Sequence, residues 1–167
     1  KRQLFMFTKL KNDSYVLELE TCCINRILKN TIFSYYDHAG GRGISPEISL
    51  PEKQLYIEGN EAGLKRMLQN IIKNGMDHGQ DKIKVQLFER EEKIHLWICN
   101  EMTNPEKIDV SRVFQRFYKA DGARSRNSSG LGLSIAQEFV LRMKGEIHAE
   151  ISENEFWVKV SFPKRVK

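Results

Sequence analysis

Cysteine is scarce in this chain, and long apolar runs are absent. The 167 residues include three cysteines, of which Cys22 and Cys23 are adjacent and Cys99 is remote. Such a set makes a poor disulfide framework, and no cysteine or histidine cluster has the spacing of a metal site. We therefore expect a reducing compartment. No stretch reaches the roughly 18 apolar residues of a membrane span, and the apolar part of residues 1–7 is too short for a signal peptide.

A strong excess of one charge is also missing. Lysine and arginine number 27 against 22 aspartate and glutamate residues, a net charge of +5. The basic residues are scattered over both ends of the chain, with an internal group at Lys119, Arg124 and Arg126. A nucleic-acid-binding function would rest on overall charge alone, so we expect no nucleic-acid partner. With 40% hydrophobic and 29% charged residues, the composition is that of a soluble globular protein.

Internal repeats, low-complexity tracts and linkers are absent between residues 15 and 162, so we expect one domain. Apolar residues at helical spacing predict helices over residues 24–35, 64–72 and 135–143. Asn60 is a suitable N-cap for the second helix, and Lys144-Gly145 closes the third. Alternating apolar residues predict strands near residues 15–20, 48–50, 54–58, 83–87, 94–98, 146–151 and 156–162, with a polar turn at 90–92. These patterns indicate an α+β fold, a two-layer sandwich of helices on a mixed, mainly antiparallel β-sheet.

Residues 100–129 form a long polar segment, interrupted only by Val113-Phe114 and Phe117-Tyr118. A connection of this length is usually functional or disordered. It leads into Gly130-Leu131-Gly132-Leu133, just before a predicted helix. Glycines at a helix start leave N–H groups open to an anion, although such turns use glycine for steric reasons at least as often. Lys119 and Arg124, in the preceding segment, favour a phosphate ligand because they supply compensating charge.

Asn70 and Asn74 project together from the edge of the second predicted helix, because they are four residues apart. An amide pair of this kind offers oxygen ligands to a hard cation such as Mg²⁺, which keeps other positions for water and phosphate. Two asparagines on a helix are more often surface residues. Their place beside an apolar stripe and next to the small Gly75 favours the metal-binding interpretation.

The order of these motifs is more specific than any one of them. Asn70-x-x-x-Asn74-Gly75 precedes a two-strand hairpin, then Val113-Phe114-Gln115-Arg116-Phe117-Tyr118, then Gly130-Leu131-Gly132-Leu133-Ser134-Ile135-Ala136. This order resembles the N box, F box and second glycine box of the catalytic ATP-binding domain of bacterial sensor histidine kinases. The resemblance runs from about residue 15 to residue 163. It implies the ATP-binding sandwich shared with gyrases, heat-shock chaperones and mismatch-repair ATPases, with a lid at about 101–129.

The resemblance also implies roles for individual residues. Asn74 would be the Mg²⁺ ligand, with Asn70 beside it contacting phosphate or metal, and Asn100 would take the adenine-recognition position. His78 would lie near the phosphates. The remaining nucleotide-binding positions implied in this way are Phe117, Tyr118, Lys119, Arg124, Gly130, Leu131, Gly132 and Leu133. The implied cofactors are ATP and Mg²⁺.

The sequence departs from the family pattern at the first glycine box. Residues 100–104, Asn-Glu-Met-Thr-Asn, contain neither the usual aspartate nor the glycines. An asparagine oxygen can accept the same hydrogen bond from the adenine amine, but without charge assistance. Ser128 replaces the first glycine of the second box, and Asp77 stands where lysine is common. The alternative function is therefore a degenerate signalling module of the same fold that binds a partner, with weak or no nucleotide binding.

The chain has four histidines, and none stands in the sequence context of a phosphoacceptor: His38, His78, His95 and His148. The resemblance thus implies a phosphoacceptor His on a separate dimerisation domain, which passes the phosphate to the receiver domain of a response regulator. We expect residues 1–14 to be the tail of that domain's helix and a linker, and residues 15–167 to be the catalytic domain. The expected parent is a homodimeric, membrane-anchored bacterial protein with this domain in the cytoplasm. An anti-sigma-factor kinase of the same superfamily is disfavoured by residues 113–121 and the helical N-terminal tail.

Overall fold

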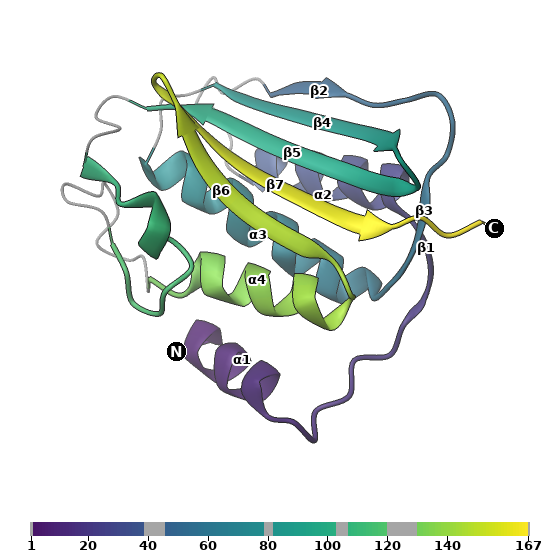
Figure 1. Ribbon diagram of the computed structural model, residues 1–167, viewed down its shortest axis with the longest axis horizontal. Helices are drawn as coiled ribbons and strands as arrows, with labels where there is room; N and C mark the ends of the chain where they lie inside the picture. The colour runs from purple at the N-terminus through teal and green to yellow at the C-terminus, as the bar shows by residue number, and fades with distance from the viewer. Residues whose placement is uncertain (1, 39–45, 79–81, 103–106, 120–129, 167) are drawn as a thin grey trace.

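A mixed β-sheet forms one layer of the molecule (Figure 1). The structure is a computed structural model that describes residues 2–38, 46–78, 82–102, 107–119 and 130–166. The strand order is β2 (Glu47–Ser49), β4 (Ile83–Arg90), β5 (Lys93–Glu101), β7 (Glu155–Pro163) and β6 (Glu146–Ser152). β2 runs parallel to β4, and the other neighbouring strands are antiparallel. The predicted mixed, mainly antiparallel sheet is confirmed.

Helices cover one face of this sheet. α2 (Ile24–His38), α3 (Glu61–His78) and α4 (Gly132–Arg142) lie along it, and α1 (Arg2–Lys11) lies beside α4, farther from the sheet (Figure 1). The strands alternate as predicted, because Ile94, Leu96 and Ile98 of β5 are buried in the core. The two-layer α+β sandwich is therefore confirmed. None of the described helices combines the length and apolar character needed to cross a membrane.

The ends of several elements follow from local chemistry that the sequence reveals. Asn60 caps α3, since its Oδ1 accepts from the Gly63 N–H at 2.9 Å. The β4–β5 turn falls on Glu91 and Glu92, which both have positive φ, 54° and 63°. That is the backbone of a two-residue hairpin turn whose twist matches the strands. Both the cap and the turn are confirmed at their predicted positions.

The strand predicted over residues 15–20 is wrong in position. The strand β1 (Glu20–Cys23) begins where that prediction ends, and it pairs with β3 (Tyr56–Gly59) in a small antiparallel sheet. Tyr15, Leu17 and Leu19 do alternate and pack against the core as partly buried residues. The alternation therefore reports burial of every second residue, while strand pairing starts only where β3 lies alongside.

The face of the sheet away from the helices carries a row of aromatic side chains. Phe88 stacks on His95 with ring centroids 5.0 Å apart, and Trp97 and Trp157 meet edge-on at 6.0 Å. The Lys159 ammonium lies 3.9 Å from the Trp97 ring centre. These residues come from β4, β5 and β7, on the side opposite the buried positions.

Candidate nucleotide site

The C-terminal part of α3 lies directly against the end of β5. A Cβ built on Gly75 would stand 3.2 Å from the Asn100 Oδ1, so the small residue lets the helix approach the asparagine closely. Asn100 is 3% exposed, and its Nδ2 donates to the Glu101 carbonyl oxygen at 3.3 Å. Asn74, one residue before this contact, is half-buried on the same helix. The predicted adenine-binding residue therefore lies against the helix that carries the predicted metal ligand.

The start of α4 also approaches α3. A Cβ on Gly132 would stand 3.4 Å from the Asn70 Oδ1, which brings the second glycine box to the first asparagine of the pair. α4 begins at Gly132, with Leu131 at the N-cap. An apolar side chain cannot cap a helix, so the first N–H groups of α4 are not satisfied by the N-cap side chain. A helix start of this kind suits an anionic ligand.

Leu131 and Leu133 have buried side chains, with exposed fractions of 0% and 5%. They anchor the helix start in the core, so only their backbone can serve a ligand. The Ser134 Oγ donates to the Leu131 carbonyl oxygen at 2.7 Å, which holds the same turn in place. The leucines of the glycine box are thus supports of the turn rather than side-chain ligands.

The first part of the expected lid folds against this turn. The Phe117 N–H donates to the Gly130 carbonyl oxygen at 2.8 Å, and a Cβ on Gly130 would clash with the Phe117 Cα at 2.7 Å. Gly130 has a positive φ of 73°, so glycine is required here for both reasons. Phe117 also has a positive φ, 62°, while its side chain is 59% exposed. A bulky residue in this backbone conformation is strained, which is typical of functional segments.

Tyr118 and Lys119 lie beside Phe117 in the lining of a cleft. The Tyr118 Oη accepts from the Asp109 N–H at 2.8 Å, and the Arg112 guanidinium lies 4.9 Å from its ring centre. These residues, with Lys107 and Lys119, line a cleft of about 530 Å³. Hydrogen bonds from Ser111 hold the pKa of Asp109 below its ordinary value. The carboxylate is therefore ionised at neutral pH, in a cleft that is otherwise rich in cations.

Cys99 is adjacent to Asn100 but belongs to the other face of the sheet. Its Sγ donates to a Glu155 carboxylate oxygen at 3.3 Å. Burial, and then this carboxylate, raise the pKa of the Cys99 thiol to about 12. A thiol with this pKa stays protonated at neutral pH, so Cys99 is a poor nucleophile there.

The structure thus brings Asn70, Asn74, Asn100, Gly132 and Gly130 to one region. Two other predicted residues are not tested by it: Arg124 lies outside the described residues, and of His78 only the place at the end of α3 is described. Within the described residues, no group of three histidines, cysteines or acids could hold a metal. An amide oxygen such as that of Asn74 fits Mg²⁺ nevertheless, since this ion takes one or two protein ligands and completes its shell with phosphate and water.

One residue of this region was missed by sequence reasoning. The Gln3 Nε2 of α1 donates to the Asn70 Oδ1 at 2.6 Å. No local pattern links residue 3 to residue 70, because the contact depends on how α1 packs on α4. The only sequence signal is the amphipathic character of the first helix, with Phe7 and Leu10 buried.

Comparison with known proteins agrees with this geometry. Residues 59–165 match the family model described as histidine kinase-, DNA gyrase B- and HSP90-like ATPase. The chain is 29% identical over 150 residues to the sensor histidine kinase YcbM of Bacillus subtilis, covering 87% of this chain and 48% of that protein. It is 34% identical over 113 residues to the sensor histidine kinase WalK of the same organism, covering 64% of this chain and 18% of that one. The chain therefore spans about half or less of these relatives.

A solved structure shows the same fold. The mycobacterial sensor histidine kinase MprB superposes with a TM-score of 0.76 at 20% identity, over 89% of this chain and 100% of that one. The matched family segment runs from the end of β3 to beyond β7, and so contains every candidate ligand described above. The chain belongs to the histidine kinase-, gyrase B- and HSP90-like ATPase family, as a catalytic ATP-binding domain of the sensor histidine kinase type.

Proposed function

We propose that this domain binds Mg-ATP and positions its γ-phosphoryl group for transfer to a histidine on a separate dimerisation domain. The observation that carries the proposal is a pair of close approaches to α3, of Asn100 at Gly75 and of Gly132 at Asn70. These approaches support a site in which adenine recognition, an amide ligand for a metal and a helix start for phosphates lie along α3. These are the parts that a nucleotide site needs.

Each part has a definite task in phosphoryl transfer. The Asn100 amide accepts from the adenine amine, and the N–H groups at the start of α4 hold phosphate oxygens. Asn74 would hold Mg²⁺, which neutralises charge on the phosphates. The transition state is loose, so the domain contributes mostly position and electrostatics rather than a nucleophile. The lid residues Lys119 and Arg124 would add positive charge near the phosphates.

We propose the remaining partners and setting on the same basis. The acceptor histidine lies outside this chain, and the phosphate passes to the receiver domain of a response regulator. Residues 1–14 are the end of the dimerisation domain and its linker, and the parent is a homodimer anchored in a membrane. The names of the sensor histidine kinase relatives support this assignment.

The test is the metal dependence of nucleotide binding. We expect Asn74→Ala to lose most of the Mg²⁺-dependent affinity for a fluorescent ATP analogue, by roughly tenfold or more, because a charged ligand contact is worth about 1.5–3 kcal/mol. Titrations of both proteins with the analogue, with and without Mg²⁺, measure this Mg²⁺-dependent affinity directly. Gln69→Ala is the matched control, since Gln69 is an exposed amide of the same helix.

Equal Mg²⁺-dependent binding by Asn74→Ala and the parent would show that Asn74 is not the ligand. The alternative is a degenerate signalling module, and the observation that favours it is Asn100 in place of an acid. Absence of binding by the parent at millimolar nucleotide, with a folded protein by circular dichroism, would favour that alternative.

A further inference from the structure

The N-terminal helix α1 reaches the candidate nucleotide site through one side chain. Gln3 donates from Nε2 to the Asn70 Oδ1 at 2.6 Å, across 67 residues of sequence. Asn70 is 6% exposed, so this oxygen faces protein rather than solvent. The residue that the family pattern assigns to phosphate or metal is therefore engaged by α1.

The orientation of both amides is set by the backbone of α3. The Asn70 Nδ2 donates to the Arg66 carbonyl oxygen at 2.9 Å. This bond turns the Asn70 oxygen toward α1, so Gln3 must present its NH₂ group. The Gln3 Oε1 is then left buried with no hydrogen-bond partner in the described part of the chain. A buried acceptor without a donor is unfavourable, and it weakens the docking of this end of α1.

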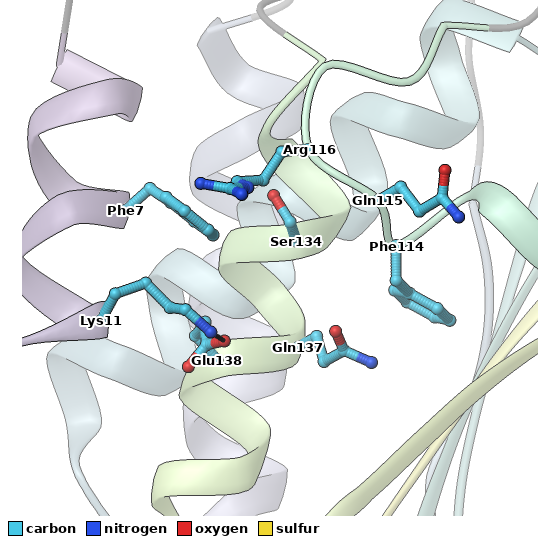
Figure 2. A pocket seen from close by; sticks show the side chains of 8 residues that line it. All are labelled: Phe7, Lys11, Phe114, Gln115, Arg116, Ser134, Gln137 and Glu138. Carbon is cyan, nitrogen blue, oxygen red and sulfur yellow. Dashed lines mark hydrogen bonds and ion pairs between the residues drawn. The ribbon is translucent and has the colours of Figure 1, made fainter.

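α1 is held more firmly at its other end. The Arg142 guanidinium of α4 donates to the carbonyl oxygens of Asn12 at 3.0 Å and Tyr15 at 2.6 Å, and to that of Leu10. Lys11 pairs with Glu138 at 3.0 Å, and Leu10 is fully buried. Figure 2 shows Phe7 and Lys11 of α1 directed toward α4.

The N-terminal end of α1 has fewer polar contacts with the rest of the domain. Phe5 is 71% exposed and Leu4 50% exposed. Its inner face packs on the core through Met6 and Phe7. Its polar contacts are Gln3 on Asn70 and, one turn farther along, Arg116 of the lid segment, whose guanidinium lies 5.6 Å from the Phe7 ring centre (Figure 2). The helix is thus anchored through its C-terminal end and attached to the site through Gln3.

We propose that Gln3 is a latch on Asn70, so that docking of the N-terminal half of α1 and binding of Mg-nucleotide oppose one another. The inference rests on the proposed function. A magnesium ion would take the Asn70 oxygen as a ligand, or a water bound to the ion would donate to it, at the atom to which the Gln3 amide now donates. When nucleotide enters, Gln3 leaves and its orphaned oxygen gains water. Because linkage is reciprocal, release of α1 favours nucleotide to the same extent.

The test compares the parent with Gln3→Met, which keeps the length of the side chain and removes its donor. We expect Gln3→Met to bind Mg-ADP about three- to tenfold more tightly by calorimetry, the loss of one competing hydrogen bond. In hydrogen–deuterium exchange, Mg-ADP should speed exchange of residues 2–7 in the parent. Gln3→Met should show fast exchange there without nucleotide. Thr8→Ala is the control, because Thr8 is exposed on α1 and its Oγ1 bonds to Leu4 within the helix.

A merely structural role for Gln3 would not raise affinity. Equal or weaker binding of Mg-ADP by Gln3→Met, or unchanged exchange of residues 2–7 in the parent, would overturn the latch while the proposed function stands. Absence of Mg-ADP binding by the parent would overturn the proposed function, and the latch with it.

Discussion

In the proposed site, Asn100 is the residue that would recognise the base. The side chain is almost fully buried at the end of β5, with its oxygen facing the gap left by Gly75. An amide can accept and donate at once, so it can pair with adenine through two bonds. A carboxylate at this position would accept only. We therefore expect the asparagine in the first glycine box to change the strength and selectivity of base recognition rather than to abolish it.

We expect Asn100→Ala to weaken ATP binding by about 1–3 kcal/mol, roughly one to two factors of ten, because the purine edge loses its partner in a buried place. Asn100→Asp should retain binding and reject GTP more firmly than the parent, since it cannot donate to a carbonyl. Affinities for ATP and GTP decide between these outcomes. Asn154→Ala is the control, as Asn154 uses its backbone oxygen to accept from Met102 at 2.7 Å. ATP binding by Asn100→Ala at parental strength would place the adenine contact elsewhere.

His95 links stability to mildly acidic pH. Burial against Phe88 lowers the pKa of this imidazole from its ordinary value. The folded state therefore favours the neutral ring, and its contribution is fully present above the pKa of the unfolded chain. As the pH falls, the unfolded state takes up the proton first. The stability that the neutral ring contributes therefore decreases until the pH is below the pKa of the folded state.

We expect His95→Phe to retain more stability than the parent as the pH is lowered from about 7 to about 5. Phenylalanine keeps the stacking on Phe88 but binds no proton. Urea unfolding of both proteins across this range measures the difference in their free energies of unfolding. The carboxylates titrate in both proteins, so their effect cancels in this difference. A difference in unfolding free energy that stays constant with pH would exclude His95 as the source.

At the scale of elements, the end of α4 shows how a helix stops without glycine in the left-handed position. Lys144 has a φ of 63°, and the Gly145 N–H donates to the Val140 carbonyl oxygen at 2.9 Å. The Lys144 N–H donates to the Leu141 oxygen at 3.0 Å, which completes a Schellman motif. Glycine is needed at the next position instead, because a Cβ on Gly145 would lie 2.6 Å from the Ser161 oxygen.

Substitutions at Lys144 and Gly145 should therefore change the stability of the domain in opposite directions. We expect Lys144→Gly to raise the free energy of unfolding by about 0.5–1 kcal/mol, since glycine adopts positive φ without strain. We expect Gly145→Ala to lower it by about 1–3 kcal/mol through overpacking against β7. Chemical denaturation measures both. A destabilised Lys144→Gly would mean that the lysine side chain stabilises the helix end by more than its backbone strain costs.

The elements differ in how far they could be predicted. The β4–β5 hairpin, the Asn60 cap and the close of α4 are predictable because each depends on residues near one another in sequence. The position predicted for β1 is wrong because strand pairing depends on β3, about 35 residues away. Motif order predicts one site for Asn70, Asn74, Asn100 and Gly132, and the structure brings Asn100 to Gly75 and Gly132 to Asn70. The contact of Gln3 with Asn70 could not be predicted, because only the packing of α1 on α4 brings the two residues together.

At the scale of the whole molecule, the two sides of the sheet carry different kinds of residue. The helix layer and the helix-facing ends of the strands hold the candidate ligands, while the outer face of the sheet carries aromatic and paired charged residues (Figure 1). Lys84 pairs with Glu155 there at 3.6 Å, and Lys159 pairs with Glu150. α1 forms a third, peripheral piece on α4. Changes on the outer face should thus leave ligand binding intact, and changes at α1 should not.

The row of indoles on that outer face gives the domain a built-in optical reporter. Trp97 and Trp157 are the only tryptophans of the sequence, and they sit on adjacent strands with rings crossed at 84°. All intrinsic tryptophan emission therefore originates on the side of the sheet away from the helices and the proposed nucleotide site. We expect tryptophan fluorescence to change on unfolding and to change little when ligand binds. The crossed pair should also produce an exciton couplet in circular dichroism, which is lost when β5 and β7 separate.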